Sequence, residues 1–386
     1  MKTISTTIMM ALLIVSLCFL GVVIKDADAQ ITVITILPDG TVDPPSGIQR
    51  NGDTYTLTDD LILPIEIKRD NIILNGANHT LQGPGAYNEA AISLKASNVT
   101  ITNCHITSWA AGIYGAFNNN TITANKFTNN DRAIALYATN YIISKNILQQ
   151  NSQGIYIKTD ALTPTGDNNL IINNQITGSS YTAFNIINSD GTTITQNNIA
   201  NNHIILVLGN RIRTNTAGQH WIYLNNFVDN TQVLQIHAAP QPGMATRPPM
   251  VPAGTWDNGA KGNYWSDYTT KYPNASERYN SGIGDTAYFI KFVFGTDIWG
   301  GEGEDHYPLS HAYDIPNDMG PQDPASSNPS PTPPIATTPK NLIDIPIEYI
   351  LATILTLIII ITITLTARYK RKQHITPAKS NILSGL

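Results

Sequence analysis

Short apolar runs separated by asparagine-rich turns repeat along most of the chain. Ten-residue units begin at Asn98, Asn119, Asn140, Asn168, Gly191 and Gln219, so their starts lie 21, 21, 28, 23 and 28 residues apart. The fourth position is always isoleucine, at Ile101, Ile122, Ile143, Ile171, Ile194 and Ile222. The ninth is always large and apolar, at Ile106, Phe127, Leu148, Ile176, Ile199 and Phe227. Such short runs with a period of two predict β-strands rather than helices.

A second apolar run follows each unit, such as GIYGA from Gly112, AIALY from Ala133 and GIYIK from Gly154. Two or three strands therefore fit in each repeat. Repeats of roughly 20 to 30 residues built in this way stack into a parallel β-helix with a rise of about 4.8 Å per coil. The isoleucines are then expected to line the interior, because β-branched side chains pack well in buried parallel strands. Segments 53–70 and 71–85 fit more loosely and are predicted to form the preceding coils.

The seventh position of the units is Cys104 in the first and an asparagine in all the others: Asn125, Asn146, Asn174, Asn197 and Asn225. Asparagine tolerates the left-handed backbone conformation of tight turns, and stacked amides can bond from coil to coil. We therefore expect these asparagines to be structural rather than catalytic.

The two ends of the chain have a different character from the repeats. Lys2, an apolar run and small residues at Ala27 and Ala29 predict a secretory signal peptide over residues 1–29. Nineteen uncharged residues from Tyr349 to Ala367 predict a transmembrane helix, and basic residues follow it. The expected protein is single-pass, type I, with its body outside the cell. Its predicted parts are a β-helix domain over 30–311, a Pro/Ser/Thr-rich stalk over 312–347, the helix over 348–367 and a cytoplasmic tail over 368–386.

The charge balance of the exported part limits its partners. Removing seven basic and two acidic residues at the two ends from the totals of 23 and 28 leaves 16 basic and 26 acidic residues, a net charge of −10. This balance argues against a nucleic-acid-binding surface. Only Cys104 remains after the signal peptide, so no intrachain disulfide forms and stability must come from a large core.

A C-terminal signature accompanies the repeats: TWDNGAKGNYWSDY from Thr255, GIGDTAYFI from Gly282 and DHYPLS from Asp305. With the repeats, it resembles the NosD-type right-handed β-helix proteins, within the wider pectin-lyase-like superfold. The resemblance implies an all-β, right-handed parallel β-helix, with the signature at 255–310 completing the domain. One departure is that SERYNSGIGD stands where such proteins often carry an acidic run. It leaves Asp285 as the near carboxylate, and a calcium site would need more oxygen ligands.

The resemblance leaves an enzyme as an alternative, since the superfold includes polysaccharide lyases and glycoside hydrolases. Glycoside hydrolysis uses paired carboxylates, and lyases generally use a base with acidic calcium ligands. The acids of the coils are scattered without such pairing, at Asp131, Asp160, Asp167, Asp190 and Asp229. No catalytic residue is assigned, and a non-enzymatic module is the preferred interpretation.

Carbohydrate binding or a structural, adhesive role in the cell envelope is the function that we predict. Alternation with inward Ile113, Ile134 and Ile155 places Tyr114 and Tyr156 on the outer surface, two coils and roughly 10 Å apart. Tyrosine rings there could stack on sugar rings. The expected partners are an envelope polysaccharide, the lipid bilayer through the C-terminal helix, and envelope proteins.

Copper handling is a third alternative, because the resemblance is to a protein that assists maturation of a copper enzyme outside the cytoplasm. Imidazole and thioether ligands are available at His237, Met244 and Met250. No cofactor is predicted from the sequence itself, and copper and calcium stay open.

Four Asn-x-Ser/Thr sequons are candidates for N-glycosylation, at Asn78, Asn98, Asn119 and Asn274. Modification requires that they lie on exposed turns.

Overall fold

The computed structural model describes residues 33–85, 89–159, 167–209, 219–237, 254–294, 302–315 and 319–321. The predicted signal peptide, transmembrane helix and cytoplasmic tail fall outside these ranges. Within them, no helix is long and apolar enough to cross a bilayer. The described chain is nearly all β-structure, and helix α2 spans only Tyr268–Lys271.

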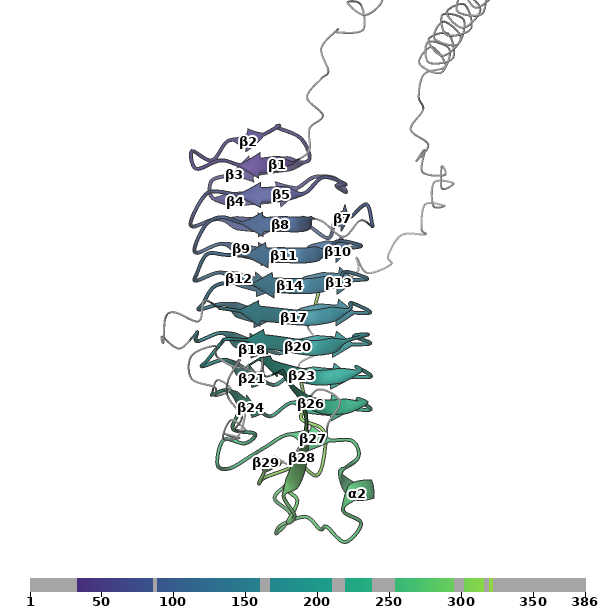
Figure 1. Cartoon of the computed structure of the whole chain (residues 1–386). Coiled ribbons are helices and arrows are strands. Elements are labelled where there is room, and N and C mark those ends of the chain that lie inside the picture. Colours follow the sequence, from purple (N-terminus) through teal and green to yellow (C-terminus); the bar gives the residue numbers. More distant parts are fainter. Residues whose placement is uncertain are drawn as a thin grey trace, which may run out of the picture. The chain divides into compact units, whose positions relative to one another are not determined.

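The strands form three sheets (Figure 1). Sheet A runs β2 (Val42–Asp43), β1 (Ile34–Ile36), β5 (Ile65–Ile67), β8 (Ala90–Leu94), β11 (Ala111–Gly115), β14 (Arg132–Leu136), β17 (Gln153–Lys158), β20 (Thr182–Ile187), β23 (Ile204–Gly209), β26 (Gln232–His237), β28 (Tyr288–Phe294) and β29 (Glu302–Asp305). Sheet B runs β24 (Trp221–Tyr223), β21 (Thr193–Thr195), β18 (Leu170–Ile172), β15 (Ile142–Ser144), β12 (Thr121–Thr123), β9 (Thr100–Thr102), β6 (Ile73–Asn75), β4 (Thr54–Leu57) and β3 (Ile48–Asn51). Sheet C runs β27 (Tyr264–Trp265), β25 (Asn226–Val228), β22 (Asn198–Ala200), β19 (Gln175–Thr177), β16 (Ile147–Gln149), β13 (Lys126–Thr128), β10 (His105–Thr107) and β7 (Thr80–Gln82).

Each repeat contributes one strand to every sheet, as β9, β10 and β11 do, so the repeats are coils of a parallel β-helix. The register is the one that the sequence alignment predicts: Ile122 pairs with Ile101 on one side and Ile143 on the other, and the pairing is parallel. The coils also extend further upstream than the sequence pattern indicates, because Ile34 of β1 pairs in parallel with Ile65 of β5. The prediction of a parallel β-helix is confirmed.

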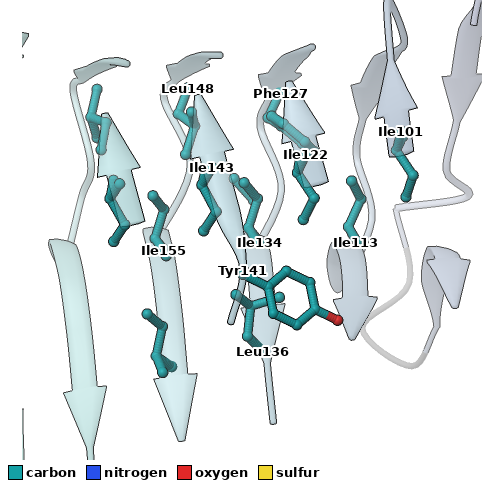
Figure 2. Packing of buried hydrophobic residues seen from close by; sticks show 14 of the residues in the cluster. Ile101, Ile113, Ile122, Phe127, Ile134, Leu136, Tyr141, Ile143, Leu148 and Ile155 are labelled. Atoms are coloured by element: carbon teal, nitrogen blue, oxygen red, sulfur yellow. The ribbon is translucent and has the colours of Figure 1, made fainter. Parts of the chain in front are cut away.

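The interior is a continuous apolar column. Figure 2 shows Ile122 and Ile143 from sheet B, Ile134 from sheet A and Phe127 from sheet C converging on the same space. All four side chains are fully buried. Burial of a large aliphatic or aromatic side chain contributes about 1.5–3 kcal/mol, as an upper estimate. A large core of this kind explains how the domain is stable without a disulfide.

Buried asparagines form a hydrogen-bonded ladder beside the column. The backbone N–H of Asn125 donates to the Oδ1 atom of Asn146 at 2.9 Å, and its side-chain amide donates to the Ile101 carbonyl, also at 2.9 Å. The same pattern continues through Asn146, Asn174, Asn197, Asn225 and Asn263. The residue before each ladder asparagine from Asn125 to Asn225 is in the left-handed region, as Asn173 is with a φ of 56°. The predicted structural role of these asparagines is confirmed.

The ladder ends on Asp305, which lies in the C-terminal signature. The Oδ2 atom of Asp305 accepts hydrogen bonds from the Asn263 backbone N–H at 2.7 Å and from the Trp265 indole N–H at 2.9 Å. A Cβ atom on Gly262 would overlap this carboxylate, which explains the glycine before Asn263. At the other end, antiparallel pairs β1–β2 and β3–β4 close the stack. Both ends are therefore built differently from the repeats.

The beginning of the predicted stalk packs against the coils. The Tyr313 backbone N–H donates to Asn226 Oδ1 at 2.7 Å, and Asn226 Nδ2 donates to the Tyr313 carbonyl at 2.9 Å. Ile315 is buried, and the Gly320 N–H bonds the Lys145 carbonyl at 2.6 Å. Residues 313–315 and 319–321 thus belong to the folded body, because they satisfy polar groups and cover apolar surface on sheet C.

Candidate functional site

The outer face of sheet A carries tyrosines on adjacent strands. Register pairs Tyr114 of β11 with Ala135 of β14, and Ala135 with Tyr156 of β17, so both tyrosines occupy the outward column that alternation predicts. Tyr114 is half-buried, whereas Tyr156 is only 8% exposed. Tyr156 is therefore less accessible than a surface ring that stacks freely on a ligand.

A third tyrosine, Tyr137, connects the two. Its ring centroid lies 5.2 Å from that of Tyr114 and 5.7 Å from that of Tyr156, with tilted planes in both pairs. Tyr137 is 36% exposed and presents the most open surface of the three. We call Tyr114, Tyr137 and Tyr156 the tyrosine strip. The sequence analysis missed Tyr137, although continuing the alternation past inward Leu136 would have placed it outside.

Two cations flank the tyrosine strip. The Lys95 ammonium lies 5.8 Å from the ring centroid of Tyr114, and the Arg132 guanidinium lies 4.7 Å from that of Tyr156. Cation–π contacts of this kind contribute about 0.5–1 kcal/mol at exposed sites. Burial raises the pKa of Tyr156 to about 12, with Tyr137 adding to the rise and Arg132 opposing it. The ring hydroxyl is thus un-ionised at neutral pH, which suits hydrogen bonding to a ligand rather than proton transfer.

Three acids of the coils, Asp167, Asp190 and Asp229, have structural partners. Asp167 Oδ2 accepts the Asp190 N–H at 2.8 Å, and Asp190 Oδ1 accepts the Gln219 N–H at 2.6 Å, so these carboxylates join successive coils. Asp229 bonds the Ser266 hydroxyl at 3.2 Å. In the part of the chain that the structure describes, no three His, Cys, Asp or Glu side chains are grouped as a metal site.

The C-terminal signature forms an end cap. The rings of Trp265 and Tyr288 stack with centroids 4.1 Å apart and planes 2° from parallel, and the Lys271 ammonium lies 3.6 Å from the Tyr288 centroid. His306 contacts Asp257 through Nδ1 at 3.0 Å and Glu304 through Nε2 at 3.1 Å. These contacts hold the segments of the signature together over the last coil, so the signature is explained by architecture.

The segment at Asp285, where the calcium alternative was placed, closes as a hydrogen-bonded loop. Asp285 Oδ1 accepts the Ser276 N–H at 3.0 Å and the Thr286 hydroxyl at 2.9 Å, and these bonds lower the pKa of its carboxyl group. Glu277 Oε1 accepts the Gly282 N–H at 2.6 Å. The carboxylates of this loop accept hydrogen bonds from N–H and O–H donors.

The copper candidates lie largely outside the described residues. The backbone of His237 ends strand β26, whereas its side chain, Met244 and Met250 are not described.

All four sequon asparagines are exposed. Asn98 Nδ2 donates to Asn71 Oδ1 at 3.1 Å, and Asn119 Oδ1 accepts from Asn140 Nδ2 at 3.0 Å, so these two belong to a ladder of surface turns. Asn78 and Asn274 lie in other turns.

Two comparisons with known proteins bear on this arrangement. A family model described as "Periplasmic copper-binding protein (NosD)" matches residues 52–270, more than half of the chain. These residues cover nearly all of the coils, the tyrosine strip and the first segment of the C-terminal signature. No curated protein matches the chain significantly.

Proposed function

Because the chain belongs to the NosD family, we propose that it is an extracytoplasmic β-helix protein that binds carbohydrate along the outer face of sheet A, without catalysing a reaction. The observation that carries this proposal is the tyrosine strip, in which three rings follow one another along the stack at 5.2 and 5.7 Å. A linear glycan lying along the stack would meet one ring after another. Tyrosine offers such a ligand an apolar face and a hydrogen-bonding hydroxyl.

Geometry favours binding over catalysis. The strip contains no carboxylate, and the acids of the coils discussed above are engaged in bonds between coils. A polysaccharide lyase or glycoside hydrolase is the alternative within this proposal. The signal peptide predicted from the sequence would direct export, and the predicted C-terminal helix would hold the domain at the cell surface as a single-pass protein, facing envelope glycans and envelope proteins.

The test is a glycan array probed with the full-length protein, combined with an assay for released reducing sugars and unsaturated products. Tyr137→Ala removes the most exposed ring and is expected to weaken glycan binding by about tenfold, since stacking on an aromatic ring supplies of order 1 kcal/mol. Tyr279→Ala is the matched control, because Tyr279 is 100% exposed and lies in the turn from Arg278 to Ser281, within the C-terminal signature. The double variant Tyr114→Ala, Tyr156→Ala should bind still more weakly. Wild-type affinity in both Tyr137→Ala and the double variant would exclude the tyrosine strip as the binding site. Release of sugar products would establish the enzymatic alternative.

Copper binding is a second candidate function, favoured by the description of the family model. His237, Met244 and Met250 supply the imidazole and thioether chemistry that binds Cu(I). We expect anaerobic calorimetry with Cu(I) to detect a site that is lost in a variant carrying Ala at all three positions. Tight binding retained by that variant would place copper elsewhere, and absence of any uptake by the wild type would remove this candidate.

A further inference from the structure

A column of cations runs along the edge of the tyrosine strip. Near the C-terminal ends of five neighbouring strands of sheet A, the pairing runs from one strand to the next through a single row of residues. This row is Ile67, Leu94, Gly115, Leu136 and Ile157. The residues that follow those of this row therefore form one outward column of Lys68, Lys95, Ala116, Tyr137 and Lys158. All members except Ala116 are exposed. The lysines of this column therefore lie in line with Tyr137, the most exposed ring of the tyrosine strip.

Cations are distributed unevenly over the three faces. On sheet A, Lys68 follows β5, Lys95 follows β8, Arg132 begins β14 and Lys158 ends β17, whereas β11 between them carries no cation. Sheet C carries Lys126. The strands of sheet B from β6 to β24 read ILN, TIT, TIT, IIS, LII, TIT and WIY, without a charged residue; Lys145 follows β15, and Arg50 lies on β3 at the end of the sheet. In a protein whose exported part is strongly acidic, positive charge is gathered beside the tyrosines.

The cations nearest to the rings are available to a ligand. Lys68 is bound by Glu66 at 2.6 Å, which neutralises the first position of the column. Among the described residues, no carboxylate lies within salt-bridge distance of Lys95 or Arg132. The Arg132 Nε atom is also buried without a hydrogen-bond partner in the described structure. Because a buried N–H donor is costly to leave unpaired, this atom favours an added acceptor.

We propose that the ligand of the tyrosine strip is a polyanionic glycan, in which carboxylate or sulfate groups along the chain meet Lys95, Arg132 and Lys158 while the sugar rings contact the tyrosines. This inference rests on the proposed carbohydrate-binding function and names its substrate class. Coils rise by about 4.8 Å each, so an extended chain along the stack would place neighbouring sugar units against neighbouring coils. Charge-assisted bonds from Arg and Lys to anionic oxygens are stronger than bonds between neutral groups.

The test measures binding of the full-length protein to four immobilised polymers: polygalacturonate, dextran sulfate, neutral dextran and single-stranded DNA. We expect at least tenfold tighter binding to polygalacturonate or dextran sulfate than to dextran, and weakening as salt is raised to 0.5 M, because exposed charges are screened. The first two polymers distinguish carboxylate from sulfate recognition. Lys95→Gln with Lys158→Gln should lower affinity for the anionic glycan about tenfold, and Lys126→Gln on sheet C serves as the matched control.

Each outcome decides one claim. Equal binding of neutral dextran and the anionic glycans, lost in Tyr137→Ala but kept in the lysine variant, would overturn the polyanionic ligand and retain carbohydrate binding. DNA binding as tight as glycan binding would show that charge alone is recognised and would overturn the glycan. Failure to bind any glycan would remove both proposals. An unchanged melting temperature of the lysine variant ensures that a loss of binding is not a loss of fold.

Discussion

The Oδ1 atom of Asn225 accepts two hydrogen bonds from Asn197, one from the backbone N–H and one from the side-chain amide, both at 3.0 Å. Asn197 in turn accepts both bonds from Asn174, at 2.8 and 3.0 Å. Each side chain is therefore donor to one coil and acceptor for another. Because amide dipoles aligned in a chain polarise one another, the ladder links the stability of neighbouring coils.

Replacing a rung should destabilise the fold. Asn197→Leu removes the acceptor of two bonds and leaves the buried N–H of Asn174 and the carbonyl of Ile171 without partners. We expect a loss of about 3 kcal/mol or more, since each buried unsatisfied group costs about 1–3 kcal/mol. Urea denaturation followed by circular dichroism measures this loss. Asn198→Leu, at the half-buried neighbouring position, should change stability little; equal effects of the two variants would contradict a ladder.

Removing a ring from the interior column should also destabilise the fold. The Phe127 side chain is fully buried, and its ring fills the space beside Gly112, where a Cβ atom would lie 2.7 Å from the Phe127 Cδ1 atom. Phe127→Ala is expected to cost about 3–5 kcal/mol through lost burial and the cavity left behind. Phe117→Ala, at a side chain that is 44% exposed, is the control for the same chemical change. A midpoint of denaturation unchanged in Phe127→Ala would be inconsistent with a packed column.

Stability should depend on pH through Asp305. Burial raises the pKa of this carboxyl from its ordinary value near 3.8 to about 6, although the N–H groups bonded to it act in the opposite direction. The folded state then binds more protons than the unfolded chain between these values. The free energy of unfolding is expected to fall by about 2 kcal/mol as pH rises from 4 to 6 and to level off above about pH 7.

Thermal denaturation at stepped pH separates Asp305 from other groups. Asp305→Asn loses an acceptor and should be less stable than wild type, but its stability should be nearly flat between pH 4 and 6. Asp229→Asn, at an exposed carboxyl near the same end, should keep the wild-type slope. The same slope in Asp305→Asn as in the wild type would assign the titration to another residue.

In a host that glycosylates exported proteins, the sequons should differ in occupancy. Asn274 is exposed in the loop after α2, whereas the amide nitrogen of Asn98, which would carry the glycan, already donates to Asn71. We expect peptide mass mapping to find a glycan at Asn274 and little at Asn98. Asn274→Gln supplies the reference mass for the unmodified site. Full occupancy at Asn98 with none at Asn274 would mean that modification does not follow these exposed turns.

The coils could be predicted from the periodicity of the sequence, because each coil of a parallel β-helix places the same repeat positions in the same structural environment. Ile101, Ile122 and Ile143 recur at one position, and a ladder of like residues in register follows from one coil lying on the next. The same regularity places the ladder asparagines in buried turns. Tyr313, in the predicted stalk, donates its backbone N–H to Asn226, 87 residues earlier, and no repeat in the sequence indicates this contact.

Only the tertiary structure showed which side chains are neighbours on the outer surface and at the two ends of the β-helix. Asn263 is a rung of the ladder although it lies 38 residues after Asn225, and Asp305 ends the ladder from a still more distant segment. Alternation in the sequence can place Tyr137 on the outer surface, but only the stacked coils show that its ring lies between those of Tyr114 and Tyr156. A position that recurs in every repeat can be predicted to be buried or exposed from the sequence. Contacts of residues outside the repeat depend on how distant segments fold onto the coils, and no local sequence pattern specifies this.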